Sequence, residues 1–189
     1  MKIFNPDVLV LAGDITGYLR GKRTVAALGG MASRVLAVRG NSDLARVENS
    51  FSENGIQSLH LTTVEIRGIG FAGISGAIPV PMWTKFRWSE GRIKKKMEDL
   101  VNKSTILVTH PPPRGLRDEV GGWMSAGSKL LRTIVEKCQP QMVICGHIHE
   151  RSGTSLEGDT VIVNCSMGRK GAGAIIDLEK GGDAKVRML

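Results

Sequence analysis

The stretch Asp7-Val8-Leu9-Val10-Leu11-Ala12-Gly13-Asp14 contains the pattern that decides the fold, an unbroken apolar run that ends in a glycine and a carboxylate. Three more apolar runs of this kind cover residues 34–38, 105–108 and 141–145. Consecutive rather than alternating apolar positions are typical of strands covered on both faces. Because amphipathic segments separate these runs, the sequence predicts a layered α/β fold.

In the segments between the predicted strands, apolar residues recur at helical spacing. This pattern predicts helices over 92–101 and 130–138 and a weaker helix over 44–53. Ser128 is expected to cap the second helix, and Pro140 to end it.

Two other segments are predicted to be hairpins. They cover residues 59–75 and 160–178, and the tail 184–188 is expected to add a strand. The sheets are therefore expected to be mixed.

Composition sets limits on the class of protein. The 189 residues are 41% hydrophobic and 23% charged, which predicts one globular domain over 1–189. There is no apolar run of the roughly 18 residues that a membrane span needs, and no signal peptide pattern, so we expect a cytoplasmic protein without a membrane partner. Three cysteines are too few and too irregular for a disulfide framework. The net charge of +8 favours anionic partners.

Ligand-type side chains follow all four predicted strands, as Gly13-Asp14, Gly40-Asn41, His110 and Gly146-His147-Ile148-His149. In open α/β sheets, functional groups gather at the carboxyl ends of strands. A single histidine there usually serves as a hydrogen-bonding group, and an isolated Gly-Asp is usually only a turn. Four such events at equivalent strand ends favour a metal site. Carboxylate, amide and imidazole donors together suit Mn, Fe, Ni or Zn.

This series of motifs resembles the calcineurin-like metallophosphoesterase superfamily, whose pattern is D-x-H, G-D, G-N-H-D/E, a lone H and then G-H-x-H. The resemblance covers nearly the whole chain. It implies two facing mixed β-sheets flanked by helices, a four-layer sandwich. It also implies a metal-dependent phosphoesterase that hydrolyses a phosphodiester or a phosphomonoester by attack of a metal-bound hydroxide.

The resemblance also implies roles for individual residues. Asp14 would bridge two divalent ions, while Asn41, His110 and His147 would complete one ion site and His149 would bind the other ion. Asp14, Asn41 and His110 would thereby be catalytic. Asn41 would also bind the substrate.

Two further charged residues are candidates near this site. Asp43 is expected to orient a ligand, with a histidine as its partner, and so to join the catalytic set; a carboxylate at a helix N-terminus is the alternative. Arg114, after the prolines that follow His110, is a candidate to hold a phosphate oxygen, with a structural role as the alternative.

The chain departs from the family pattern at two points. No D-x-H precedes Asp14, so two ligands of the second ion are missing and a single-ion site becomes an alternative to the family's two ions. We expect a start codon assigned too far downstream; a truncation and a protein that uses one metal are the alternatives. Ser42 stands where the family often has a histidine that protonates the leaving group, which favours substrates with good leaving groups.

Two other functions compete with the phosphoesterase. A catalytically impaired binding scaffold with the same fold would explain the missing D-x-H. A nuclease would suit the positive charge and the aromatic and basic residues over 83–88, although nucleic acid is not the favoured partner. We expect a phosphorylated substrate. We also expect a homo-oligomer, because an exposed inner strand edge invites association.

Overall fold

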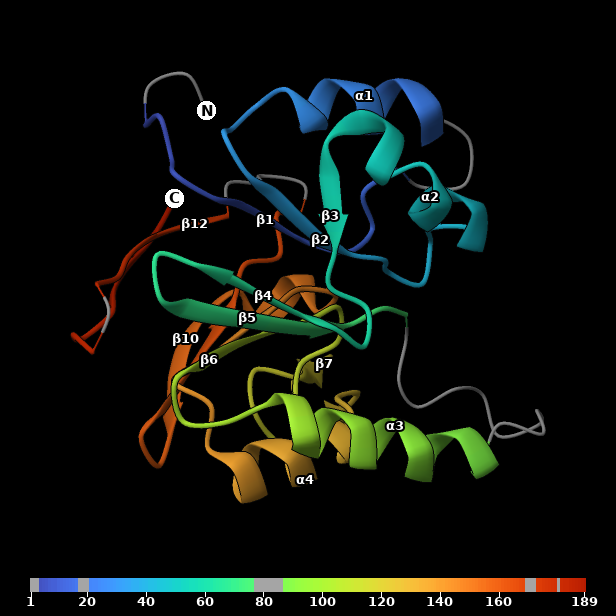
Figure 1. Cartoon of the computed structure of the whole chain (residues 1–189). Coiled ribbons are helices and arrows are strands. Elements are labelled where there is room, and N and C mark those ends of the chain that lie inside the picture. Colours follow the sequence, from blue (N-terminus) through green and yellow to red (C-terminus); the bar gives the residue numbers. More distant parts are fainter. Residues whose placement is uncertain (1–3, 17–20, 77–86, 169–172, 180) are drawn as a thin grey trace.

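The computed structural model describes residues 4–16, 21–76, 87–168, 173–179 and 181–189. Helices form the two outer layers, and sheets lie between them (Figure 1). The helices α1 (Gly21–Gly29) and α2 (Ala45–Asn49) lie on one side, and α3 (Arg87–Leu100) and α4 (Lys129–Cys138) on the other. The predicted four-layer α/β sandwich is confirmed.

Two sheets form the inner layers. The first has three parallel strands in the order β1-β2-β3, namely β1 (Leu9–Ala12), β2 (Val35–Val38) and β3 (Ile56–Ser58). The second has the order β10-β11-β9-β6-β5-β4 and mixes both strand directions. Its strands are β4 (Thr63–Ile66), β5 (Ile69–Ile74), β6 (Thr105–Thr109), β9 (Met142–Cys145), β10 (Gly153–Glu157) and β11 (Thr160–Asn164). Mixed pairing was predicted for both sheets, but the smaller sheet is parallel throughout its described strands.

The remaining elements are short. Two-stranded sheets join β7 (Glu119–Val120) to β8 (Met124–Ser125) and β12 (Ala174–Asp177) to β13 (Lys185–Met188). Single 3₁₀ turns form η1 (Ser52–Asn54) and η2 (His149–Arg151). No helix in the described part of the chain is long and apolar enough to cross a bilayer.

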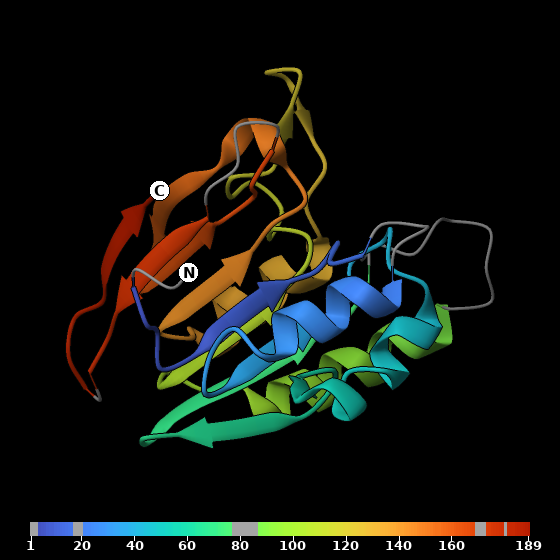
Figure 2. The same ribbon diagram turned by 90° about the horizontal axis from the view of Figure 1, so that it is seen from above.

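The consecutive apolar runs reflect burial on both sheet faces. In β2, Leu36 and Val38 pack into the core between the two sheets, while Val35 and Ala37 pack beneath α1 and α2. Figure 2 shows these helices lying over the three-stranded sheet. β1 alternates in the same way but is only half-buried, because it is the edge strand of its sheet as described.

The local predictions had different outcomes. The hairpin over 59–75 forms as β4 and β5, and the tail forms β13. The predicted hairpin over 160–178 is wrong, because β11 pairs with β10 and β9, whereas β12 pairs only with β13. The predicted helix over 44–53 is shorter, with α2 followed by η1.

Candidate metal centre

Four of the predicted ligands meet at the edge between the two sheets. Asp14 and Asn41 follow β1 and β2 of the three-stranded sheet, while His110 and His147 follow β6 and β9 of the other sheet. Each of these four side chains follows the carboxyl end of its strand, so folding brings together residues that are far apart in the sequence.

The His110 ring lies at the centre of this group. Its Nε2 atom is 2.8 Å from Asn41 Oδ1, 3.0 Å from His147 Nδ1 and 3.4 Å from Asp14 Oδ2. The ligand atoms of Asp14, His110 and His147 all lie within 4.8 Å of one another. Two atoms that bind one cation at about 2.0–2.2 Å lie at most about 4.4 Å apart. The separations of 2.8–3.4 Å from His110 Nε2 satisfy this limit.

The hydrogen bond of His110 Nδ1 determines which ring nitrogen faces the other three side chains. Its Nδ1 lies 2.9 Å from the Ala12 carbonyl oxygen and donates its proton there. With Nδ1 occupied in this way, a neutral ring presents its Nε2 lone pair to the side-chain oxygens of Asn41 and Asp14. Because several electron pairs converge on one point, the residues fit a divalent cation, the group that removes their mutual repulsion.

The backbone around the ligands is held in unusual conformations. Asp14 and His147 both adopt left-handed φ angles, 52° and 70°, which cost free energy and concentrate at functional sites. A Cβ atom on Gly40 would lie 2.1 Å from Asp14 Oδ1, and one on Gly13 would lie 2.5 Å from His110 Nδ1. Both glycines are thus required by the close approach of a ligand.

Asp43 does not contact a histidine, which corrects the expected partner. Its buried carboxylate accepts hydrogen bonds from the backbone N–H groups of Gly40, Ile15 and Thr16 and from the Thr16 hydroxyl, at 2.8–3.0 Å. Burial alone would raise the pKa of Asp43, but these hydrogen bonds outweigh it and lower the pKa. Asp43 therefore ties the loop of Asp14 to the loop of Asn41.

His149 and Arg114, the two other candidates for the site, are exposed. His149 is exposed at the start of η2 and does not belong to the group of converging ligand atoms. Arg114 is exposed, and its backbone N–H donates to the Ser128 carbonyl. Its contact with a substrate stays a prediction.

The electrostatics keep His147 ready to bind a metal. Burial lowers the pKa of His147, the neighbouring His110 and His149 lower it further, and Asp14 opposes them. The net shift is downward. The neutral imidazole, which is the form that binds metal, is therefore favoured at neutral pH.

Sequence reasoning gave no role to Asn164, a fully buried residue at the end of β11. Its amide nitrogen donates to the carbonyl oxygens of Ile148 (2.9 Å) and Arg117 (3.3 Å), and its Oδ1 accepts from the Ser166 N–H. It thereby holds the turn that carries His147. The signal in the sequence was the stretch Asn164-Cys165-Ser166, which resembles the Asn-Pro-Gly-Ser segment near the end of small calcineurin-like phosphoesterases.

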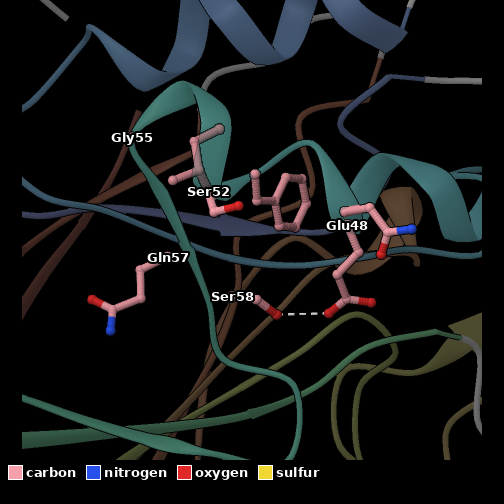
Figure 3. A pocket seen from close by; sticks show the side chains of 8 residues that line it. Glu48, Ser52, Gly55, Gln57 and Ser58 are labelled. Carbon is pink, nitrogen blue, oxygen red and sulfur yellow. Dashed lines mark hydrogen bonds between the residues drawn. The ribbon is translucent and has the colours of Figure 1, made fainter.

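A hollow of the described surface lies away from this group. It has a volume of about 630 Å³ and lies between α2, η1 and β3 (Figure 3). Its lining residues are Glu48, Asn49, Phe51, Ser52, Gly55, Ile56, Gln57 and Ser58. None of the four converging ligands lines it.

Known proteins resemble this chain in sequence. The sequence model of the metallophosphoesterases of the calcineurin superfamily matches residues 47–187. The uncharacterized protein MJ1162 of Methanocaldococcus jannaschii is 33% identical over 172 residues, which cover 85% of this chain and 77% of that protein. Human metallophosphoesterase domain-containing protein 1 is 41% identical over 64 residues, 33% of this chain and 20% of that protein.

Solved structures share the fold. One crystal structure covers 99% of this chain and 90% of its own chain with a TM-score of 0.75 at 21% identity. TT1561 of Thermus thermophilus covers 96% of this chain and 86% of its own, with a TM-score of 0.64 at 19% identity.

Proposed function

Because the chain belongs to the calcineurin superfamily of metallophosphoesterases, we propose that it is a metal-dependent hydrolase of a phosphodiester or a phosphomonoester. The observation that carries the proposal is the convergence of Asp14, Asn41 and His147 on Nε2 of His110. A bound divalent ion, with Mn, Ni, Fe or Zn as the candidates, would neutralise phosphate charge and lower the pKa of a bound water to supply the nucleophile.

The side chains at the site would have separate roles in binding the cation and the substrate. The Asp14 carboxylate, oriented by the Ser42 N–H at 3.0 Å, would hold the cation together with His110 and His147. Asn41 directs its Oδ1 toward His110, which leaves its amide N–H₂ group to donate to a phosphoryl oxygen. Ser42 is a poor proton donor at neutral pH, so the preferred substrates would have leaving groups that need no protonation.

Metal content and hydrolysis test the proposal together. Purified protein should retain a divalent transition metal in elemental analysis and hydrolyse a nitrophenyl phosphodiester when Mn²⁺ or Ni²⁺ is added. His147→Ala should lose both properties, whereas Thr133→Ala, on α4 outside the site, should keep both.

Each outcome has a distinct meaning. Metal content that is unchanged in His147→Ala would contradict the metal centre. A protein that binds metal and hydrolyses neither nitrophenyl phosphodiesters nor nitrophenyl phosphomonoesters would favour a binding scaffold with this fold.

A further inference from the structure

The four ligands come from two different sheets, so their geometry depends on how these sheets are held together. Asp14 and Asn41 belong to the three-stranded sheet, and His110 and His147 to the six-stranded sheet. One direct link is the hydrogen bond from His110 Nδ1 to the Ala12 carbonyl. The apolar core between the sheets is non-directional and does not by itself fix their offset to the precision that a metal site needs.

A cluster of polar side chains joins the two sheets at Arg39, which precedes Asn41 by two positions. We call Arg39, Glu48, Ser58 and Ser75 the intersheet network. Ser75, at the end of β5, accepts the Arg39 N–H at 3.0 Å and donates its hydroxyl to Glu48 Oε1, also at 3.0 Å. The next residue, Gly76, donates its N–H to the Arg39 carbonyl at 2.6 Å. The Arg39 backbone is therefore held on both its N–H and its carbonyl by the other sheet.

Glu48 is the hub of this network. Its Oε1 also accepts the Ser58 hydroxyl at 2.6 Å (Figure 3), and its Oε2 lies 3.5 Å from Arg39 Nε. The Glu48 and Arg39 side chains are only 19% and 24% exposed, so water weakens these contacts less than it would on the surface. Arg39 Nη1 in turn donates to the Asp43 carbonyl at 3.3 Å. The network thus holds the loop of Asn41 at both of its ends.

From this arrangement we propose that Ser75 and Glu48 are positioning residues of the metal centre. They touch neither the ligands nor the ion position. They act by fixing the Asn41 loop of one sheet against the strand β5, which pairs with the strand of His110 in the other sheet. The inference rests on the proposed metal-dependent function and adds residues that set the affinity of the site.

Mn²⁺ affinity, measured by isothermal titration calorimetry on the metal-free protein, tests the proposal. Ser75→Ala removes the hydroxyl that joins Arg39 to Glu48. It should weaken Mn²⁺ binding by up to roughly tenfold, because losing a group that contacts a ligand directly costs about 10- to 100-fold and Ser75 acts one step further away. Glu48→Gln should weaken it in the same direction. Because both act through one network, the double variant should bind about as weakly as Ser75→Ala alone.

Controls separate positioning from general stability. Ser52→Ala, an exposed serine near Glu48, should keep the wild-type affinity. Ser75→Thr, which retains the hydroxyl, should recover most of it. The thermal midpoint of each metal-free variant shows whether a loss of affinity merely follows a loss of fold.

The outcomes distinguish this inference from the function on which it rests. Wild-type affinity in Ser75→Ala and Glu48→Gln would overturn the positioning role and leave the proposed function intact. A loss of affinity that scales with the thermal midpoint and is not recovered by Ser75→Thr would also overturn it. Wild-type protein that binds no Mn²⁺ would overturn both proposals.

Discussion

At the scale of single residues, His60 shows how its surroundings change the titration of a residue that looks unremarkable in the sequence. It stands alone in the sequence, and no function was predicted for it. In the structure, its Nδ1 accepts the Ser75 N–H at 3.0 Å, and its own N–H donates to Ser58 Oγ. Burial lowers the pKa of His60, Glu48 raises it and Arg39 lowers it, with a net downward shift from 6.5. The native state therefore favours the neutral ring.

This shift predicts a specific dependence of stability on pH. Below pH 6.5 the unfolded chain protonates His60 while the native protein resists it, so the free energy of unfolding falls as the pH decreases toward the lower native pKa. His60→Asn keeps an acceptor for the Ser75 N–H and removes the titration. Urea unfolding between pH 7 and pH 5 should give a shallower slope for the variant.

His147 also has a lowered pKa, so it contributes to the slope in both proteins and cancels in the comparison. Parallel pH profiles for wild-type protein and His60→Asn would contradict the assignment of the neutral ring.

At the scale of elements, the sequence predicted those strands and helices that depend on a local pattern of apolar and capping residues. The four strands that carry the candidate ligands follow from apolar runs, three of which lead into a glycine, and α4 follows from its apolar stripe and the Ser128 cap. Ser128 does accept the Leu131 N–H, at 3.3 Å. These features need no knowledge of distant contacts.

Features that depend on distant partners were not predictable in this way. The strand β11 has β10 on one side and β9 on the other, so neither edge is left to pair with the segment that follows it. Asp43 binds the backbone at Ile15 and Thr16, 28 and 27 positions away, and no spacing rule reveals such a partner. The exposed position of His149 likewise depends on η2, a turn without a sequence signature.

The capping of α4 gives a prediction at this scale. Ser128 is fully buried, and its carbonyl accepts N–H groups from Arg114 and Arg132. Ser128→Ala should lower the free energy of unfolding by about 1 kcal/mol, the usual contribution of an N-cap side chain. Denaturant titration measures this.

A matched substitution within the same helix serves as control. Thr133→Ala replaces a side chain whose hydroxyl bonds back to the Lys129 carbonyl at 3.2 Å, and alanine has the higher helix propensity. It should leave stability unchanged or raise it slightly. An equal loss of unfolding free energy in both variants would contradict a stabilising role of the Ser128 cap.

At the scale of the whole molecule, the proposed metal centre would link the two inner layers. Two of the candidate ligands come from each inner sheet, and helices cover the outer faces (Figures 1 and 2). A cation bound to all four ligands would resist any sliding of one sheet over the other. Metal binding should therefore stabilise both halves of the sandwich and not only the loops that contact the ion.

The stabilisation follows from the linkage of binding to folding. With free Mn²⁺ at 100 times its dissociation constant, the free energy of unfolding should rise by about 2.7 kcal/mol, provided that the unfolded chain does not bind the ion. Amide hydrogen exchange should slow in β2 of one sheet and in β6 of the other, because the site joins their carboxyl ends. His147→Ala should show neither effect. Protection confined to one sheet, or an equal gain in His147→Ala, would mean that the ion binds at a site other than the one between the layers.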